Sequence, residues 1–357
     1  MTNTVTGCER YRVIQPLEAL RSKGHATAWM TADRVMGEVN RGRNPLELAD
    51  IILVNRPAIP RKSLPAYVGL FDFIRQRNPK VRFVCDFDDD LTGTDRKTYA
   101  DEFDLATPDL RIFDRITVTT QELRKVYLKQ NPRVTVIPNF VRTPDFMNRV
   151  KMTLSDRITI GLTGSITHKQ DWQAVMNPLR RIIAEFGNAV QVFTSGFEVP
   201  ELLDYITPID LGISPELVVP WNEYPLVFAQ MDFCLIPLDP SDGFNHSKSN
   251  IKFLEASASA RIIDGVVGGC PSIVVSDPPI YLDVAHNEQN CLLVRHNSPD
   301  DWHKAIRRMI TDTKLRKKLS IGAFKTAVEW NLEKNVDRIA AVYENIIRSP
   351  AGSLPVA

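Results

Sequence analysis

The sequence predicts an α/β protein built from two doubly wound, Rossmann-like domains that face a central cleft. Short apolar runs rich in β-branched residues alternate with longer helical patterns, which is typical of parallel-sheet α/β units. This series is interrupted once, at 138–152, by two prolines and a run of charges that indicate a linker. At roughly 150 residues per domain, a chain of 357 residues also favours two domains.

The first domain is expected to span residues 1–145. Its apolar runs are short enough for strands, and the stretches between them carry the wider spacing of amphipathic helices. The predicted strands are 26–30, 51–54, 81–85, 116–119 and 134–137, and the predicted helices are 12–23, 64–76 and 121–130.

The second domain is expected to span residues 155–330 and repeats the same alternation. The predicted strands are 158–162, 190–194, 217–219, 233–237, 272–276 and 291–294, and the predicted helices are 172–185, 250–258, 299–311 and 313–329. A last helix is predicted within 334–350. Ligands of such sheets bind at the carboxyl ends of the strands, so polar residues there are the candidates for a site.

Composition excludes several classes of protein. The 44 Lys and Arg balance 43 Asp and Glu, so the charge does not demand a polyanionic partner. No apolar run approaches a membrane span, and the start lacks the layout of a signal peptide, so we expect a cytoplasmic protein. The five cysteines include no C-x-x-C pair and are expected to be reduced. Dinucleotide, P-loop, nucleophile-elbow and zinc-protease motifs are absent, so we expect neither a cofactor nor a metal.

The most informative polar cluster follows the apolar run 233–238. Ser249 or Asn250 is expected to cap a helix, and Lys248 and Lys252 add positive charge beside that helix start, which favours a phosphate site. Glu255 lies farther along, where a carboxylate can accept hydrogen bonds from the vicinal hydroxyls of a ribose. The alternative is a solvated amphipathic helix with a Lys–Glu pair.

A second cluster, GLTGSITHKQD at 161–171, directly follows the first predicted strand of the second domain. Small residues such as Gly164 and Thr167 let the backbone approach a ligand, while His168 and Lys169 can clamp a diphosphate. An ordinary strand-to-helix loop is the alternative.

A third cluster contains four carboxylates, Asp86, Asp88, Asp89 and Asp90, at the end of a predicted strand. Such a cluster repels itself unless it meets cations, donors or a substrate. Asp86 and Asp88 also match a short D-x-D metal motif, and an exposed turn is the other alternative.

Two arginines near the start, Arg10 and Arg12, are placed to reach a phosphate or to lie on the surface as ordinary charges.

These segments together resemble the GT-B glycosyltransferases of the large retaining family 4, also called group 1. GCERYRVIQPLEALRSKGH is similar to the family's opening loop and helix, and VTVIPNFV to the turn that closes its first domain. GLTGSITHKQDW resembles the donor-phosphate loop, and SKSNIKFLEASAS with GGCPSIVVSD and NCLLV resembles the donor-binding signature. The end of the chain resembles the helix that crosses back onto the first domain. CERYR, DFDDDL and SKSNIKFLE are closer to a bacterial and phage subgroup.

The chain departs from the family pattern in three places. Ser247 stands where the family has the first of two glutamates, and only Glu255 is kept. SARIIDGVVG is inserted before the segment Gly269-Cys-Pro271. The family's first strand is reduced to about TNTVTG.

The resemblance implies a glycosyltransferase that moves a sugar from a nucleotide-diphosphate sugar to an acceptor hydroxyl, with retention and without a metal. Lys169 and Lys248 would stabilise the leaving diphosphate, and Asp88, Asp89 or Asp90 would orient the acceptor. The donor would contact Gly164, Thr167, His168, Lys169, Ser247, Lys248, Ser249, Asn250, Lys252 and Glu255.

Two other functions stay open. The first is transfer to a modified base in DNA, as in some phage enzymes, which would act in the host cytoplasm; Arg307, Arg308, Lys314, Arg316, Lys317 and Lys318 would then form a basic face. The second is a catalytically inactive GT-B-like binding protein, which the replacement at Ser247 allows.

Overall fold

A computed structural model describes residues 7–41, 46–92, 104–147, 157–164, 168–196 and 223–349 of the chain. The chain divides into two compact units. The first unit comprises Met1–Asn139, Ser247–Ser249 and Asn335–Ala357, and the second comprises Phe140–His246 and Asn250–Lys334. The predicted strand at 217–219 and the candidate residue Thr167 lie outside the described residues.

The first unit contains a parallel sheet with strand order β1-β3-β5-β6. Its strands are β1 (Ile51–Asn55), β3 (Arg82–Phe87), β5 (Arg115–Val118) and β6 (Val134–Val136), and a separate two-stranded sheet pairs β2 (Ile59–Pro60) with β4 (Leu105–Ala106). Buried β-branched and aromatic residues fill both faces of β3, as expected for a central strand of a parallel sheet.

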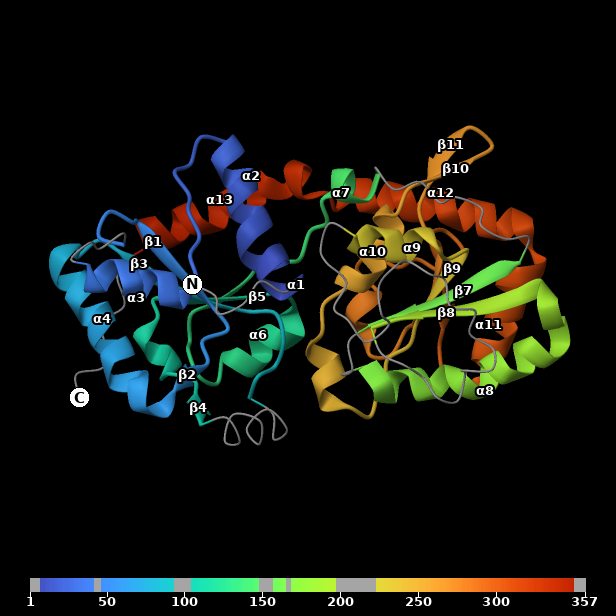
Figure 1. The fold of residues 1–357 in the computed structure, drawn as a ribbon, viewed down its shortest axis with the longest axis horizontal. Helices are drawn as coiled ribbons and strands as arrows, with labels where there is room; N and C mark the ends of the chain where they lie inside the picture. Colours follow the sequence, from blue (N-terminus) through green and yellow to red (C-terminus); the bar gives the residue numbers. More distant parts are fainter. Residues whose placement is uncertain are drawn as a thin grey trace. The chain divides into compact units, whose positions relative to one another are not determined.

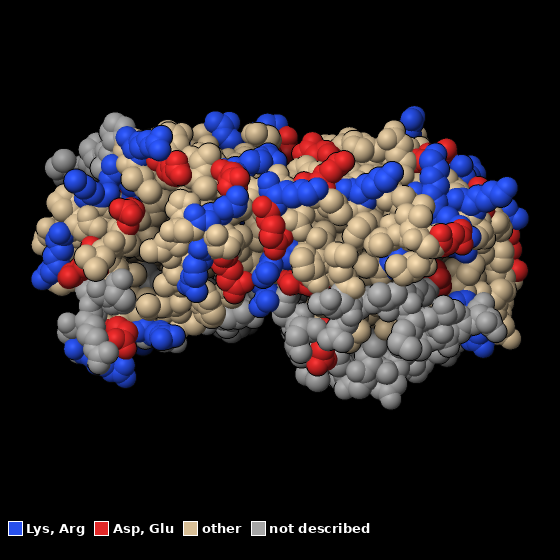
Figure 2. Space-filling view, turned by 90° about the horizontal axis from the view of Figure 1, so that it is seen from above, with Lys and Arg blue, Asp and Glu red and all other residues tan. Residues whose placement is uncertain are grey.

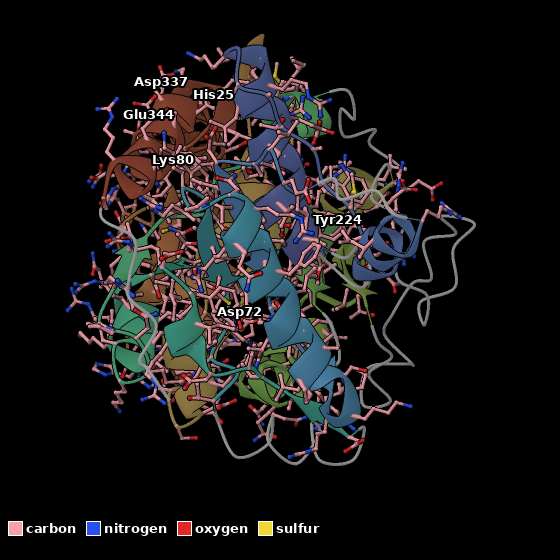
Figure 3. The ribbon with its side chains drawn as sticks, turned by 90° about the vertical axis from the view of Figure 1, so that its left-hand side faces the viewer. His25, Asp72, Lys80, Tyr224, Asp337 and Glu344 are labelled. Carbon is pink, nitrogen blue, oxygen red and sulfur yellow. The ribbon has the colours of Figure 1, made fainter. Side chains whose placement is uncertain are left out.

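Helices cover both faces of this sheet (Figure 1). The described helices are α1 (Gly7–Glu9), the π-helical turn η1 (Arg10–Ile14), α2 (Gln15–Ser22), α3 (Ala32–Asn40), η2 (Arg61–Ser63), α4 (Leu64–Arg77), η3 (Leu110–Ile112), α6 (Gln121–Tyr127) and most of α13 (Leu332–Arg348). One core lies between the sheet and the pair α4 and α6, where Phe71 stacks on Phe83 with ring centroids 4.2 Å apart. Figure 3 views this unit with α4 and its Asp72 in front, and with Asp337 and Glu344 along α13.

The second unit contains a five-stranded parallel sheet with strand order β13-β12-β9-β7-β8. Its strands are β7 (Ile158–Thr163), β8 (Val190–Ser195), β9 (Phe233–Ile236), β12 (Ser272–Val275) and β13 (Cys291–Val294). The chain moves outwards to β8 and then returns past β7 to β9. The strand order therefore reverses between β7 and β9, which is the switch point where ligands of doubly wound sheets bind.

The helices of the second unit include three long ones around its sheet, of which α8 and α11 are strongly amphipathic (Figure 1). The described helices are α7 (Thr143–Met147), α8 (Lys169–Phe186), η5 (Gly187–Ala189), α9 (Tyr224–Ala229), η7 (Gly243–Ser247), α10 (Ile251–Ala258), η8 (Pro279–Tyr281), α11 (Pro299–Thr311) and α12 (Thr313–Glu329). Their apolar faces form one core with the strands, in which Trp172 and Trp302 are fully buried.

The structure confirms the predicted α/β class with parallel sheets, corrects one predicted strand and adds a hairpin for which no element was predicted. Residues 26–30 are not a strand, because this segment is largely exposed and Trp29 is 39% exposed. The inserted segment is a β-hairpin of β10 (Arg261–Ile263) and β11 (Val266–Gly268), paired antiparallel. Among the described residues, no helix is long and apolar enough to cross a membrane.

Candidate functional site

The carboxyl end of β7, beside the switch point of the second sheet, carries a glycine that two polar side chains approach closely. A Cβ atom on Gly164 would lie 2.8 Å from Cδ2 of His168 and 3.0 Å from Nζ of Lys252. His168 directly precedes α8, and Lys252 lies in the first turn of α10. The structure therefore brings together three residues that were predicted from two separate sequence clusters.

The backbone beside Gly164 is packed equally closely. Gly164 N donates to Ser195 O over 3.1 Å, and Gly196 follows with a φ of +113°. A Cβ on Gly196 would lie 1.8 Å from the carbonyl oxygen of Gly164. Glycine is required here because a side chain would separate the ends of β7 and β8.

A buried carboxylate holds the His168 ring in place. Asp171 is 2% exposed, and its Oδ2 lies 2.7 Å from Nδ1 of His168. Its Oδ1 accepts from the backbone N of Asp239 over 2.8 Å and from Nδ2 of Asn245 over 2.6 Å. Asp171 thereby connects the start of α8 to the loop after β9 through hydrogen bonds across the switch point. It also fixes the orientation of the His168 ring.

Glu255 occupies the second turn of α10 and is 5% exposed. Its Oε2 accepts a hydrogen bond of 2.9 Å from the hydroxyl of Tyr224, in the first turn of α9. Burial, followed by the Glu255 charge, raises the pKa of Tyr224, so the phenol stays a donor at neutral pH. Carboxylate oxygens are acceptors that suit hydroxyl donors.

The start of α10 differs from the sequence prediction. The residue before the helix is Asn250, and its side chain makes no capping hydrogen bond. The Ser249 hydroxyl instead accepts from Nδ2 of Asn139 over 2.9 Å, within the first unit. Neither residue caps the helix through its side chain, so the first amides of α10 lack the acceptor that a cap supplies.

The other predicted donor residues lie in different places. Ser247 and Lys248 are buried and belong with Ser249 to the first unit. Lys169 is the first residue of α8 and is exposed. Their predicted contacts with a donor stay predictions.

In the first unit, Arg12 and Asp86 form a buried ion pair at the carboxyl end of β3. Nε and Nη2 of Arg12 donate to Oδ2 and Oδ1 of Asp86 over 2.9 and 2.7 Å. Nη1 donates to the carbonyl of Ile137 and to Oδ1 of Asn139. Asp86 accepts further hydrogen bonds from Asn55 and Thr117.

This network argues against two candidate roles. Arg12 is 4% exposed and its donors are used internally, so it joins the N-terminal helical segment to the sheet instead of reaching a phosphate. Asp86 is 1% exposed and saturated with donors, which leaves it no lone pair for a D-x-D metal site. Arg10 is half-buried in the same π-helical turn.

A second group of charges lies next to this pair. Nη1 of Arg56 lies 2.9 Å from Sγ of Cys8, 3.5 Å from Oδ1 of Asp88 and 3.8 Å from Oδ2 of Asp89. Arg56 has a φ of 45°, a left-handed backbone conformation that is strained for a residue other than glycine. Asp88 is 7% exposed, and its Oδ1 has no hydrogen-bond partner. Burial, and then the Asp88 charge, raises the pKa of the Cys8 thiol.

The donor atoms of Cys8, Asp88 and Asp89 lie within 4.8 Å of one another, a spacing that suits a metal ion. The Arg56 guanidinium already supplies positive charge among them, so a divalent cation would be repelled at that position. The residues present therefore fit an arginine-neutralised carboxylate pair better than a metal centre.

Asp90 has a local structural role. Its Oδ1 accepts from the backbone N of Thr92 over 2.8 Å and from its hydroxyl over 2.6 Å, which forms a turn. Of the three predicted acceptor-side carboxylates, Asp88 and Asp89 face the Arg56 guanidinium.

Three of the six residues of the predicted basic face are paired with carboxylates. Arg307 pairs with Glu185 over 2.6 Å, Arg308 with Glu288 over 2.5 Å and Lys317 with Asp264 over 2.7 Å. On the face that Figure 2 shows, Lys and Arg side chains are interspersed with Asp and Glu. This pattern does not favour a nucleic-acid groove.

Sequence reasoning missed Arg56 and Tyr224 as partners of the candidate carboxylates. Arg56 directly follows the strand 51–55, and polar residues after parallel strands are candidates for a site, so its position was a usable signal. Tyr224 carries no comparable signal, because only the fold brings α9 beside α10.

No protein-family model and no curated protein matches the sequence. Solved structures with a similar fold include Anabaena HepE in complex with UDP-glucose, with a TM-score of 0.62 and 12% identity over 97% of this chain and 98% of that chain. Sucrose-phosphate synthase from Thermosynechococcus elongatus gives a TM-score of 0.58 and 13% identity, over 96% of this chain and 94% of that chain. TarM gives a TM-score of 0.54 and 13% identity, over 84% of this chain and 55% of that chain. These likenesses show that the chain has the GT-B fold.

Proposed function

We propose that the chain is a glycosyltransferase that uses a nucleotide-diphosphate sugar, with a UDP-sugar as the first candidate. The observation that carries the proposal is the convergence of Gly164, His168 and Lys252 at the carboxyl end of β7, with Glu255 one turn farther along α10 from Lys252. HepE, which has a similar fold, is described in complex with UDP-glucose. Only the fold is shared at such low identity, so the local residues must support the activity.

The chemistry of these residues suits such a donor. The ammonium of Lys252, the His168 ring and the uncapped start of α10 offer positive charge and N–H donors to a diphosphate. These interactions strengthen as the diphosphate leaves and gains charge. Lys169 and Lys248 are proposed to assist the departure, and Glu255 to accept hydrogen bonds from the ribose hydroxyls.

The finer proposal is a retaining, metal-independent reaction of the family 4 type. The cationic groups above supply the charge stabilisation that a metal supplies in other transferases. The engagement of Asp86 with Arg12 supports this, because the D-x-D alternative needs that carboxylate. Asp88 and Asp89 are proposed to orient the acceptor hydroxyl of a glycan, with Arg56 restraining their charge.

The donor assignment is tested with Glu255→Gln. The substitution keeps the shape of the side chain and removes its charge, so UDP-glucose should bind about 1 to 3 kcal/mol more weakly by calorimetric titration. Asp283→Asn is the matched control, because Asp283 is an exposed carboxylate of the same unit. Equal affinity of folded Glu255→Gln and wild type would remove Glu255 from the site.

Turnover separates the remaining alternatives. A panel of nucleotide sugars is screened for transfer or hydrolysis, with and without chelator. We expect activity that persists in chelator. Binding without any turnover would favour an inactive GT-B-like protein, and transfer only to hydroxymethylated DNA would favour the phage-type enzyme.

A further inference from the structure

The inserted β-hairpin and α12 line an open cavity. Asp264 and Gly265 join β10 to β11 with φ values of 49° and 80°, the geometry of a two-residue hairpin turn. The hairpin lies tightly on the helix, since a Cβ on Gly268 would lie 2.4 Å from Oγ of Ser320. Between them is a cavity of about 330 Å³, and its lining includes Asp232, Arg261, Arg316, Lys317 and Ser320.

This cavity is distinct from the candidate donor site. Asp232 immediately precedes β9 and Pro271 immediately precedes β12, and both line the cavity. The strands are parallel, so the cavity lies at the amino edge of the sheet. Gly164 follows the carboxyl end of β7 at the opposite edge.

The cavity wall holds a buried guanidinium with unused donors. Arg261 is 7% exposed, and its Nη1 donates to the carbonyl of Asp232 over 3.1 Å. Its Nε and Nη2 are buried without hydrogen-bond partners. Unpaired N–H groups of a buried cation are costly, so an acceptor in the cavity would relieve this cost.

Charged groups of both signs line the cavity. Arg316 directs Nη1 to the carbonyls of Met309 and Ile310. Burial is the main cause that lowers its pKa; the nearby Arg261 charge acts in the same direction, and the charges of Asp232 and Asp312 oppose it. The first residue of α12, Thr313, also lines the cavity, and the start of this helix is capped by Asp312, whose Oδ1 accepts from the backbone N of Leu315 over 2.9 Å. Of the two lining carboxylates, Asp264 is paired with Lys317, and Asp232 Oδ2 accepts from the backbone N of Thr159 over 2.7 Å.

We infer that this cavity binds the phosphate group of a small molecule or lipid. A tetrahedral oxyanion accepts the paired N–H groups of a guanidinium, and Arg316 and Lys317 line the same cavity. The volume accommodates a phosphomonoester. Ile262 and Val266 on the same hairpin are 60% and 48% exposed, so an anionic lipid headgroup is a second source of the same chemistry. The inference does not depend on the proposed function.

The test is a calorimetric titration of the full chain with inorganic phosphate. The titration is carried out with the Lys252→Met variant, so that phosphate binding at the candidate donor site does not contribute to the measured heat. In this background, Arg261→Met should weaken phosphate binding about tenfold or more. Flotation is then measured with phosphatidylcholine vesicles, with or without phosphatidylglycerol. A lipid headgroup is identified as the source if the protein binds only the vesicles that contain phosphatidylglycerol and if Arg261→Met abolishes this binding.

A second pair of variants keeps the test decisive if Arg261→Met does not fold. Lys317→Glu reverses a charge at the rim, where the side chain is 45% exposed, and should weaken phosphate binding several-fold. Lys325→Glu makes the same change at an exposed position of α12 outside the cavity lining and should have little effect. The inference is overturned if neither phosphate nor anionic vesicles bind, or if binding is unchanged in both Arg261→Met and Lys317→Glu.

Discussion

At the scale of single residues, the candidate donor site depends on the absence of a side chain at position 164. His168 and Lys252 approach Gly164 at distances that a Cβ atom could not share without displacing them. The glycine thus sets how closely an ammonium and an imidazole ring come to the end of β7. A ligand phosphate held there meets both groups together.

We expect Gly164→Ala to weaken UDP-glucose binding about tenfold or more, because the methyl group would push Lys252 and His168 away from their positions. Calorimetric titration measures the change. Gly69→Ala is the control, since Gly69 lies within α4 with open space around its Cα and should tolerate alanine. An affinity that survives Gly164→Ala would mean that the donor binds elsewhere.

The sequence made some residues of the site predictable and left others hidden. Lys252 and Glu255 were predictable because both lie near a helix start that follows a strand. The roles of Tyr224 and Asn245 were not predictable. Their hydrogen bonds, to Glu255 and to Asp171, join residues 31 and 74 positions apart. Local patterns indicate which residues carry chemistry, but the fold decides their partners.

At the scale of elements, the N-terminal helical segment is joined to the first sheet by one buried ion pair. Arg12 lies in the π-helical turn η1, and Asp86 lies in β3. Their side chains are 3% and 1% exposed, so neither charge has water as an alternative partner. Tyr343 of α13 lies near the same pair, and burial, followed by the Asp86 charge, raises its pKa. Three elements therefore depend on these charges.

Arg12→Met should destabilise the protein by about 3 to 5 kcal/mol, because it leaves the Asp86 carboxylate buried without its cation. Adding Asp86→Asn should restore part of this loss, since the unpaired charge is then removed. Urea unfolding followed by circular dichroism measures both. Lys23→Met is the control: its pair with Asp337 is exposed and should contribute less than about 1 kcal/mol. A double variant less stable than Arg12→Met would contradict the mechanism.

Most elements with strong periodicity were predictable, and α12 has the predicted bounds. The segment 26–30 misled because Ala, Thr and Trp there are apolar or β-branched, although no neighbouring strand covers them in the described structure. The β10–β11 hairpin had a local signal, Asp-Gly between β-branched pairs, that was overlooked. The strand order was not predictable, because the β7–β9 switch point follows from long-range pairing that no local sequence pattern encodes.

At the scale of the whole molecule, each unit has its own core, and each unit holds tyrosines whose pKa is raised. Burial is the main cause that raises the pKa of Tyr67, Tyr127 and Tyr343 in the first unit and of Tyr224 and Tyr281 in the second. In an unfolded chain these phenols titrate near pH 10. The folded state then holds protons that the unfolded state has lost.

This difference predicts a steep alkaline transition. A folded-state pKa above the unfolded value contributes stability that is present below about pH 10 and is lost as the pH rises towards the folded pKa. Each such tyrosine lowers the free energy of unfolding by about 1.4 kcal/mol per pH unit above that point. The first unit, with three of these tyrosines described, should lose stability faster than the second, with two.

Absorbance at 295 nm, circular dichroism and tryptophan fluorescence against pH check this prediction together. The buried Trp172 and Trp302 report on the second unit, so their signal should change at a higher pH than the first rise in tyrosinate absorbance. Tyr67→Phe is the matched variant, because the Tyr67 hydroxyl is buried without a hydrogen-bond partner. It should make the first transition shallower by about 1.4 kcal/mol per pH unit. Tyrosines that titrate near pH 10 while circular dichroism stays native would show that water reaches them in the folded protein.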